Sequence, residues 1–429
     1  MKTVGIASLG CRVNQYESGA ISQELTALGF KVLPFNQKCD CYIVNTCAVT
    51  EESVRKSRQM VRRAVKTNPD SFVFVCGCAS QLSKDDFLSI KGVKFVYGTR
   101  NKGVIVKAVK DLFEGQDVEA DAVKDPEGKL DKTFISHFDR TRAYVKIQDG
   151  CNNKCAYCII PKVRGRIVLR DKDEIVNEVK ALASNGCHEV VLTGIETSAY
   201  GMNLGVLIKE ISEIEGIDRI RMGSLDPSFV KSGFIDDIAS VKQLCPHFHI
   251  SVQNGSDDVL KAMRRRYNTQ MLYDNISYIR SVIPNSKFSA DIIVGFPGET
   301  DEDFKRTCEF VQKIGFLHLH IFTYSIRPGT EAAEMQGQVP DSIKNQRHKI
   351  LSDIASEMKN SMLNEIINKG EKISVLVETL DGMTLTGHND SFVECVIEAE
   401  DKLCKMDMRG SIIDATPIKA VKGKLICTI

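Results

Sequence analysis

The sequence lacks a net charge large enough to indicate a partner. Its 57 lysines and arginines stand against 56 aspartates and glutamates, which leaves a formal net charge of +1. A nucleic-acid-binding protein that used its whole surface would carry a strong basic excess. Any surface for a nucleic acid must therefore be a local patch of basic residues.

A long hydrophobic run is also missing. No apolar stretch approaches the roughly 20 residues that a membrane-spanning helix needs. The first residues, MKTVGIASLGC, contain one lysine and a short apolar run, which fits a strand entering a loop better than a signal peptide. We therefore expect a cytoplasmic protein with no membrane partner.

Cysteine, by contrast, is abundant, with 15 in 429 residues. Disulfides are rare in the cytoplasm, so metal binding is the more informative interpretation of this number. Not every cysteine needs such a role, and those that stand singly in periodic segments are expected to be small buried side chains. These are Cys187, Cys245, Cys308, Cys395, Cys404 and Cys427.

The pattern of apolar residues predicts an α/β protein of several domains. Residues 1–114 alternate strands and helices, which predicts a doubly wound parallel sheet. Residues 115–140 are polar and aperiodic, as in a linker. Residues 141–369 contain six further strand–helix units, which predict a partial (β/α)6 barrel with its chemistry at the carboxyl ends of the strands. Residues 370–429 contain five short strands, typical of a small antiparallel β-barrel that binds oligonucleotides.

Three cysteines follow the first strand of the predicted partial barrel. Cys151, Cys155 and Cys158 lie in GCNNKCAYCIIPKVRGR with C-x3-C-x2-C spacing. Thiolates in a short loop suit zinc or an iron–sulfur cluster. A structural zinc site needs a fourth ligand, and this stretch contains none. A zinc loop closed by a distant ligand stays open as the alternative.

Three other cysteines follow three successive strands of the first domain. Cys11, Cys47 and Cys78 each stand directly after a predicted strand. The carboxyl ends of parallel strands share one edge of a sheet, so we expect the three thiols to converge there. The remaining cysteines of this domain are expected to pack in its core, namely Cys39, Cys41 and Cys76.

The C-x3-C-x2-C motif, with the aromatic Tyr157 before its last cysteine, resembles the radical S-adenosylmethionine (SAM) superfamily. The resemblance implies a 4Fe–4S cluster on the three cysteines, whose unligated iron binds SAM. One electron then cleaves SAM to a 5′-deoxyadenosyl radical. Further positions match the superfamily's looser motifs LTGIE, HISVQNGS and DIIVGFPGE and are expected to contact the cofactor, as is Tyr157: Gly194, Glu196, Ser251, Gln253, Ile293 and Gly295.

The first three cysteines resemble those of the methylthiotransferase family. The family's G-C-x-x-N, N-T-C and G-C-x-x-Q motifs read here GCRVN at 10–14, NTC at 45–47 and GCASQ at 77–81. One difference is Glu17 after Tyr16, where many members carry Asp. The resemblance covers residues 1–429. It implies a second 4Fe–4S cluster on Cys11, Cys47 and Cys78, and a small RNA-binding barrel of the TRAM type at the carboxyl terminus.

The same resemblance implies the reaction. One SAM methylates a sulfur held on the second cluster, another yields the radical, and the resulting substrate carbon radical takes the methylthio group. A one-electron reductant of the flavodoxin or ferredoxin type and a sulfur donor are implied as partners. No step requires a protein acid or base, so we assign no catalytic side chain.

The substrate follows from the closest resemblance within the family, which is to the branch that modifies C2 of N6-threonylcarbamoyladenosine at position 37 of tRNA. The isopentenyladenosine branch typically reads Gly-Gln-Asn where this chain has Gly194-Ile195-Glu196. Four alternatives stay open: isopentenyladenosine, a ribosomal-protein aspartate, a radical enzyme without sulfur transfer, and a two-cluster electron-transfer protein or RNA scaffold.

Basic residues beside the motif are the expected substrate contacts. Lys162, Arg164 and Arg166 follow the radical cysteines, and Arg265 lies in MRRRY. They would meet the threonylcarbamoyl carboxylate or a tRNA phosphate. The terminal segment, residues 371–429, has 7 lysines and arginines against 10 aspartates and glutamates, so we do not expect it to bind RNA strongly alone.

Overall fold

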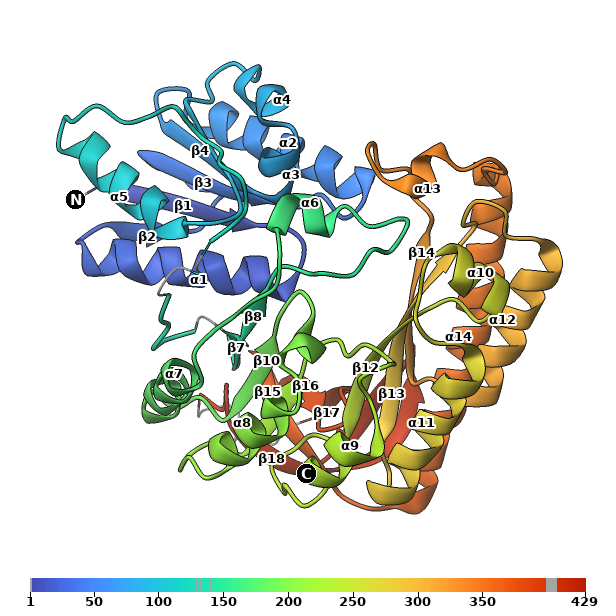
Figure 1. Cartoon of the computed structure of the whole chain (residues 1–429). Coiled ribbons are helices and arrows are strands. Elements are labelled where there is room, and N and C mark those ends of the chain that lie inside the picture. Colours follow the sequence, from blue (N-terminus) through green and yellow to red (C-terminus); the bar gives the residue numbers. More distant parts are fainter. Residues whose placement is uncertain (1, 129, 131–132, 139, 399–406) are drawn as a thin grey trace.

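The computed structural model describes residues 2–128, 130, 133–138, 140–398 and 407–429. Three regions succeed one another along the chain (Figure 1): an N-terminal parallel sheet, a central region of strands and helices, and a C-terminal group of strands. Within the described ranges, no helix combines the length and apolar character needed to cross a membrane.

The N-terminal sheet has six parallel strands in the order β2-β1-β3-β4-β5-β6. They are β1 (Thr3–Ser8), β2 (Lys31–Leu33), β3 (Cys41–Thr46), β4 (Phe72–Gly77), β5 (Phe95–Tyr97) and β6 (Asp121–Ala122). The helices that connect them are α1 (Arg12–Ala27), α2 (Glu51–Thr67), α3 (Cys78–Leu82), α4 (Lys84–Leu88) and α5 (Lys102–Phe113).

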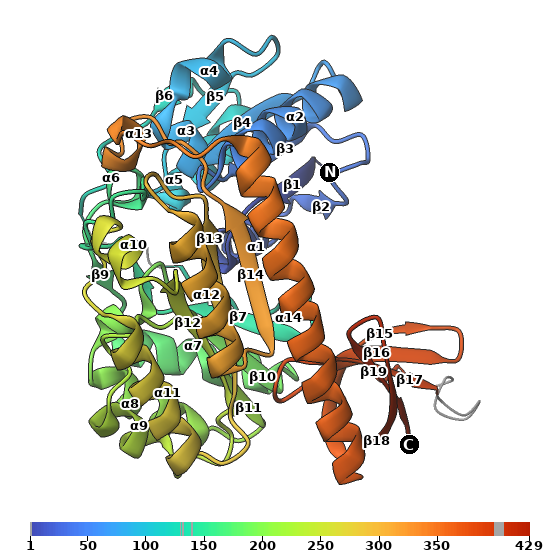
Figure 2. The same ribbon diagram turned by 90° about the vertical axis from the view of Figure 1, so that its right-hand side faces the viewer.

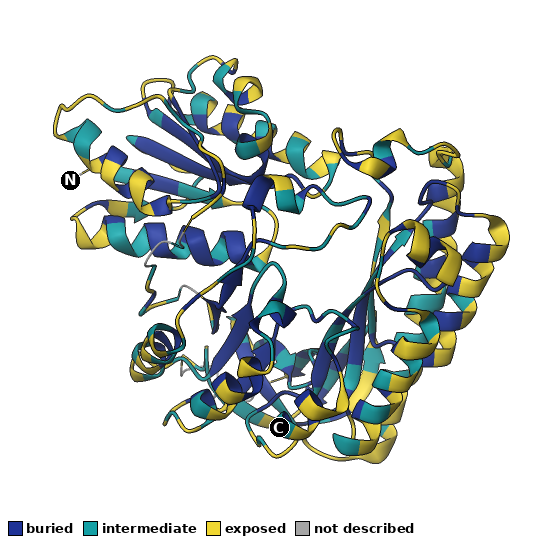
Figure 3. Cartoon of the chain, in the orientation of Figure 1, coloured by how far each residue is buried: buried dark blue, intermediate teal, exposed yellow. Residues whose placement is uncertain are grey.

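Helices cover both faces of this sheet, so its central strands are buried on both sides. Every residue of β3 is buried. Tyr42 and Val44 pack in the core beneath α2, whereas Ile43 packs with α1 and α5 on the other face. Figure 3 shows these strands as the most deeply buried part of the region. The predicted parallel α/β architecture is therefore present here.

The central region contains six strands in two parallel three-stranded sheets. One sheet has the order β11-β10-β7 and the other β12-β13-β14. An isolated bridge between Leu225 and Ile250 joins them, and one hydrophobic core extends across both. The strands are β7 (Arg142–Lys146), β10 (Glu189–Thr193), β11 (Arg219–Met222), β12 (His247–Gln253), β13 (Lys287–Val294) and β14 (His318–Thr323).

The helices of the central region alternate with its strands, as the sequence pattern predicts. The first long one begins after Asp171, whose carboxylate accepts hydrogen bonds from the backbone N–H groups of Asp173 and Glu174. The helices are α6 (Ile160–Arg164), α7 (Lys172–Ser184), α8 (Asn203–Ser212), α9 (Ser232–Ile238), α10 (Asp257–Ala262), α11 (Thr269–Val282), α12 (Asp301–Ile314), α13 (Glu331–Glu334) and α14 (Asp341–Lys369). The region also contains a 3-10 turn at Thr197–Tyr200. Two further short strands, β8 (Gln148–Asp149) and β9 (Val168–Leu169), pair with each other.

Residues 115–140 connect the first two regions and make specific contacts with both. Ile135 is fully buried against Tyr16 of α1 and Tyr144 of β7. The backbone N–H of Ser136 donates to Gln23 at 3.0 Å. These isolated contacts hold the connection against the two sheets without producing a periodic pattern.

The five C-terminal strands pair in the order β15-β16-β17-β19-β18, and β18 pairs again with β15. They are β15 (Ile373–Asp381), β16 (Thr384–Asn389), β17 (Glu394–Glu398), β18 (Ile412–Val421) and β19 (Lys424–Thr428). The pairing of β17 with β19 is parallel, so the expectation of a purely antiparallel arrangement is wrong at this pair. Helix α14 runs along the molecule and ends beside these strands (Figure 2).

Arginines of the central sheet bind the loop between β16 and β17. Arg221 donates to the carbonyl oxygens of Asn389 and Asp390 and pairs with the buried Glu189 at 3.0 Å. The guanidinium of Arg221 also lies 4.9 Å from the ring centre of Phe392. The C-terminal strands are therefore fixed to the central region by hydrogen bonds to backbone oxygens, which do not depend on the identity of the loop side chains.

Most cysteines predicted to pack as small apolar residues do so. Cys39, Cys41, Cys76, Cys245, Cys395 and Cys427 are buried, and Cys187 and Cys308 are half-buried against the central core. Cys404 lies outside the described residues.

Candidate functional site

Cys11, Cys47 and Cys78 lie at one edge of the N-terminal sheet. Cys11 follows β1 and precedes α1, Cys47 follows β3, and Cys78 begins α3 directly after β4. These three strands are neighbours, so their carboxyl ends bring the thiols together. Burial raises the pKa of Cys78 to about 12; Arg164 opposes this rise, while Cys11 and Cys47 add to it. The structure therefore places the three cysteines after neighbouring strands, at one edge of the sheet.

Two glycines that precede these cysteines leave room for the group. A Cβ on Gly10 would lie 2.6 Å from Sγ of Cys47, and a Cβ on Gly77 would lie 2.5 Å from the carbonyl oxygen of Thr46. Both also have positive φ, at 91° and 103°, where side chains are strained. The glycine of each Gly-Cys pair thus sets the sharp turn that places the thiol.

We expect Gly77→Ala to destabilise the protein by about 1–3 kcal/mol, because the new Cβ meets the backbone of β3 in a strained conformation. The turn that holds Cys78 must shift, so iron bound by this triad should fall. Gly29→Ala is the matched control, with a φ of 86° and open space around its Cβ. Gly29→Ala should lower the stability of the protein by only about 1 kcal/mol, from backbone strain alone, and the protein should keep its iron. Equal iron contents of the two variants would contradict this role of Gly77.

Cys151, Cys155 and Cys158 lie in the loop between β8 and α6 and are all half-buried. Burial is the main cause that raises the pKa of Cys151 to about 11 and that of Cys158 to about 12. Arg265 donates a hydrogen bond to Sγ of Cys155 at 3.1 Å. The second triad thus lies in one short loop, with a guanidinium against one of its sulfurs.

The residues of both triads can be compared with what a metal ion or a cluster needs. Among the described residues, no three Cys, His, Asp or Glu side chains are close enough to hold one metal ion. A 4Fe–4S cluster places each thiolate on a different iron, which suits such spacing. Each triad also has one arginine donor, since Nε of Arg164 lies 3.3 Å from Sγ of Cys78. Hydrogen bonds to sulfur stabilise cluster thiolates, so the residues fit the group.

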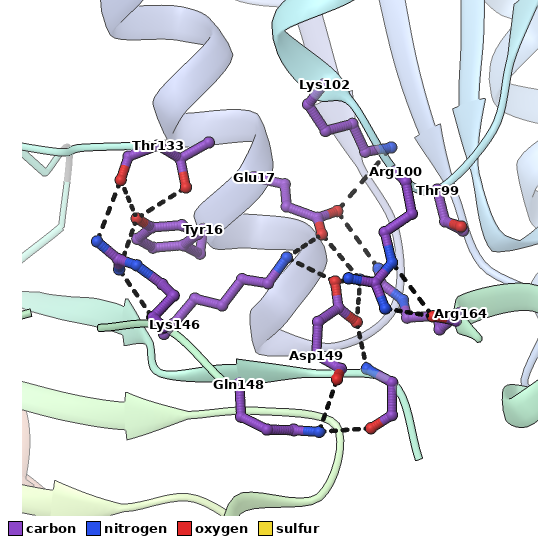
Figure 4. Close-up of polar contacts among 12 residues, drawn as sticks. Tyr16, Glu17, Thr99, Arg100, Lys102, Thr133, Lys146, Gln148, Asp149 and Arg164 are labelled. Atoms are coloured by element: carbon purple, nitrogen blue, oxygen red, sulfur yellow. Dashed lines mark hydrogen bonds and ion pairs between the residues drawn. The ribbon is translucent and has the colours of Figure 1, made fainter. Parts of the chain in front are cut away.

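Arg164 is the centre of a buried polar network that joins the two regions (Figure 4). Its guanidinium donates to Glu17 of α1 at 2.8 Å and to Asp149 of β8 at 3.1 Å. Lys146 of β7 bridges the same two carboxylates at 2.9 and 2.6 Å. Burial alone would raise the pKa of Glu17, but Arg164 and the neighbouring lysines hold it at about 2. Arg164 also follows Cys158 by only six residues, so one short segment contacts both triads.

This geometry corrects the prediction for two of the four expected substrate contacts. Arg164 is fully buried and its donors are directed to Glu17, Asp149, Asn14 and Cys78. Arg265 donates to Cys155, Asp226 and Tyr267 and is also largely buried. Both guanidiniums therefore lie against cysteine thiols rather than at an open surface.

The other two predicted contacts remain at the surface. Lys162 lies within α6 and Arg166 follows its end; both are exposed, and Nζ of Lys162 donates to the carbonyl oxygen of Gly329. Both are accessible to a large substrate that approaches the cysteine loop.

The residues expected to contact the cofactor lie at the ends of three central strands, on the side of the cysteine loop. After β10, Glu196 accepts a hydrogen bond from Asn153 of that loop at 2.9 Å, and a Cβ on Gly194 would meet Gln148 at 2.7 Å. Burial, with Asp226 adding to it, raises the pKa of Glu196 to about 7.

Of the remaining members, Tyr157 lies in the cysteine loop itself, and Ser251, Gln253, Ile293 and Gly295 lie in or directly after strands of the second sheet. The carbonyl oxygen of Ser251 accepts from Arg265, the residue that contacts Cys155, and Gln253 ends β12 with a φ of 69°. The edge of the Tyr157 ring faces Phe296, 6.4 Å away. After β13, the backbone N–H of Gly295 donates to Glu299, and the carbonyl oxygen of Ile293 accepts from Asn254.

Sequence reasoning did not identify Glu17, Lys146 and Asp149 as site residues. The available signal was a charged side chain within an apolar pattern, such as Lys146 after AYV in β7. A lysine there is buried only when it is paired, which would have pointed to an acidic partner.

Comparison with known proteins agrees with this site. The Radical SAM superfamily matches residues 145–311, and the Uncharacterized protein family UPF0004 matches residues 3–98. The threonylcarbamoyladenosine tRNA methylthiotransferase MtaB of Bacillus subtilis is 35% identical over 98% of this chain and 94% of its own. The protein of the same name from Thermotoga maritima is 38% identical over 92% and 91%. A tRNA-2-methylthio-N(6)-dimethylallyladenosine synthase of Pelotomaculum thermopropionicum is 35% identical over 88% and 87%.

Among solved structures, the radical S-adenosylmethionine methyltransferase TsrM of Kitasatospora setae has a TM-score of 0.61 at 14% identity, over 77% of this chain and 76% of that one. This likeness concerns the fold alone. The match to the Radical SAM superfamily, with the cysteine loop at the ends of parallel strands, defines a radical SAM protein. Within that superfamily, the chain belongs to the methylthiotransferase family.

Proposed function

We propose that this protein is a radical SAM enzyme that transfers a methylthio group to C2 of N6-threonylcarbamoyladenosine at position 37 of tRNA. One observation carries the proposal: a chain that aligns almost entirely with threonylcarbamoyladenosine tRNA methylthiotransferases also has two separate thiol triads at strand ends. One triad would suffice for radical formation, so the second has its own task, which is to supply sulfur.

In this proposal, four segments have different tasks. Residues 1–114 hold the second cluster, and residues 115–140 link it to the radical domain at 141–369. The two central sheets act as one partial (β/α)6 barrel, supported by their common hydrophobic core and the bridge between them. Residues 370–429 act as a small RNA-binding barrel, supported by the strand order that returns to β15.

The six cysteines hold two 4Fe–4S clusters, one on Cys11, Cys47 and Cys78 and one on Cys151, Cys155 and Cys158. When bound, the clusters and SAM supply the radical that activates the C–H bond and the sulfur that is transferred. The protein positions these groups: Arg164 holds Cys78, and Arg265 holds Cys155. Because both guanidiniums are buried and paired, the thiols keep their places without exchange of hydrogen bonds with water.

Glu196 is our candidate for the methionyl end of SAM. Its carboxylate lies beside the cysteine loop, and burial, with Asp226 adding to it, raises its pKa, so a cation bound there would be favoured. The ammonium and sulfonium groups of SAM would provide it. Tyr157, Gly194, Ser251, Gln253, Ile293 and Gly295 complete the surroundings of the cofactor in this proposal.

Lys162 and Arg166 are proposed to contact tRNA phosphates, because they are exposed next to the cysteine loop. The reaction also needs a one-electron reductant of the flavodoxin or ferredoxin type and a sulfur donor. We place the reaction in the cytoplasm, where tRNA is modified.

A second substrate deserves a direct test, because the relative from Pelotomaculum thermopropionicum is also 35% identical and its name gives dimethylallyladenosine. We expect the reconstituted enzyme to methylthiolate tRNA that carries threonylcarbamoyladenosine and to leave isopentenyladenosine tRNA unchanged. A site with polar partners for the threonylcarbamoyl carboxylate should discriminate strongly against the apolar isopentenyl group, which would leave those partners without a hydrogen bond. Nucleoside mass spectrometry of both tRNAs after one reaction measures this choice, and modification of the isopentenyl tRNA alone would reject the proposed substrate.

A further inference from the structure

A cavity of about 140 Å³ lies where the three regions meet. A single buried water needs roughly 10–15 Å³, so the cavity has room for a larger group. Arg12 lines it from α1, Arg221 from β11, Lys359 from α14, and Phe392 from the loop between β16 and β17. Five of the chain's eight histidines also line it: His247, His249, His318, His320 and His388.

The charges around this cavity are mainly positive. Arg12, Arg221 and Lys359 face a single lining acid, Glu394, whose carboxylate pairs with Lys424 at 2.7 Å. Arg221 is compensated by Glu189. Among the described residues, neither Arg12 nor Lys359 forms an ion pair or donates a hydrogen bond; Arg12 lies only over the ring of Tyr144. Two cations at the cavity therefore lack an acidic partner.

The histidines add ring nitrogens to the cavity, and two of them already pair with carboxylates: His249 with Asp291 at 3.3 Å and His388 with Glu378 at 2.6 Å. Burial, with the nearby Lys359 adding to it, lowers the pKa of His318 to about 4, and burial lowers the pKa of His320 as well. His247 is only 6% exposed, and its buried Nε2 has no hydrogen-bond partner within the described chain. A buried polar atom without a partner costs free energy unless a ligand satisfies it.

We propose that this cavity is an oxyanion site for the RNA substrate, in which Arg12, Lys359 and His247 bind carboxylate or phosphate oxygens. The inference rests on the proposed function and deepens it, because it assigns the substrate's charged group to residues other than those beside the cysteine loop. Two cations without an acidic partner and a buried ring nitrogen without a partner, which donates when it carries the ring proton, match an anion that accepts several hydrogen bonds. Arg12 directly follows Cys11 in the sequence, so this cavity and the proposed sulfur-donating triad are connected through the start of α1.

Two oxyanions of the tRNA have this chemistry: the carboxylate of the threonylcarbamoyl group and a backbone phosphate. Binding of tRNA with and without threonylcarbamoyladenosine separates them, because both RNAs carry the same phosphates. The variants are Lys359→Gln and Arg12→Gln, and the matched control is Lys349→Gln, an exposed lysine of the same helix α14.

We expect Lys359→Gln and Arg12→Gln to weaken tRNA binding roughly 10- to 100-fold, as for loss of a hydrogen bond between charged groups. A loss confined to modified tRNA identifies the carboxylate. An equal loss for both RNAs, with the salt dependence of binding reduced by about one unit of slope, identifies a phosphate. Unchanged binding of both RNAs by both variants would overturn the proposal.

A second measurement does not depend on the proposed reaction. Inorganic phosphate should raise the melting temperature of the unaltered protein more than chloride at equal ionic strength, and this difference should disappear in Lys359→Gln. If the unaltered protein fails to modify either tRNA but phosphate still stabilises it through Lys359, the proposed function fails and the oxyanion site stands. If the unaltered protein modifies threonylcarbamoyladenosine tRNA, but the substitutions change neither tRNA binding nor the effect of phosphate on the melting temperature, the oxyanion site is rejected and the proposed function stands.

Discussion

Replacement of Cys151, Cys155 and Cys158 together with alanine is expected to leave about half of the iron that the unaltered protein binds after anaerobic reconstitution, because each triad holds its own cluster. Release of 5′-deoxyadenosine from SAM should stop in this variant. Iron analysis and chromatography of the SAM products measure the two effects. The reciprocal triple replacement of Cys11, Cys47 and Cys78 should also lose half of the iron but continue to release 5′-deoxyadenosine.

Cys187→Ala is a suitable control, because Cys187 is half-buried like the radical cysteines but belongs to neither triad. It should keep all of its iron and both activities. Retention of all iron by the Cys151, Cys155 and Cys158 variant, or stoichiometric zinc in the unaltered protein, would refute the assignment of clusters to these cysteines.

Arg164→Met should destabilise the protein by about 3–5 kcal/mol, the usual effect when one partner of a buried ion pair is removed. The side chain is fully buried, and its loss leaves Glu17 and Asp149 with Lys146 as their main remaining cation. Cys78 also loses its donor. We therefore expect the iron of the first triad to fall as well, which a purely structural role in the central region would not predict.

Arg166→Met is the control for this change, because Arg166 is exposed two residues away on the same segment. Its effect on the free energy of unfolding should stay within about 0.5 kcal/mol, as for most surface substitutions. Denaturant unfolding of the two variants, together with iron analysis, compares them directly. An Arg164→Met protein as stable as Arg166→Met, with full iron, would show that the network does not couple the two regions.

Much of the fold could be predicted from periodicity alone. The strands at β1, β3 and β4 are short apolar runs between helical segments, and their parallel pairing fixes where Cys11, Cys47 and Cys78 lie. Parallel strands end at one edge of a sheet, and this general rule predicts that cysteines 36 and 31 residues apart in the sequence lie at the same edge. The same rule placed the C-x3-C-x2-C loop at the ends of the central strands.

The network of Arg164 could not be predicted in this way. Its partner Glu17 lies 147 residues away in the sequence, in helix α1 of the N-terminal region, so no local pattern relates the two. Nearness to Cys158 suggested a contact with substrate, whereas the packing of α6 against α3 buries the side chain. The parallel pairing of β17 with β19 was missed for a similar reason, because strand patterns show alternation but not direction.

The most direct test of the proposed function follows a labelled methyl group. The reconstituted enzyme is incubated with tRNA that carries threonylcarbamoyladenosine, a one-electron reductant, and SAM whose methyl group is deuterated. The account predicts a 2-methylthio nucleoside that retains all three deuterium atoms, together with 5′-deoxyadenosine from a second SAM. Release of 5′-deoxyadenosine without any labelled methylthio nucleoside would contradict it.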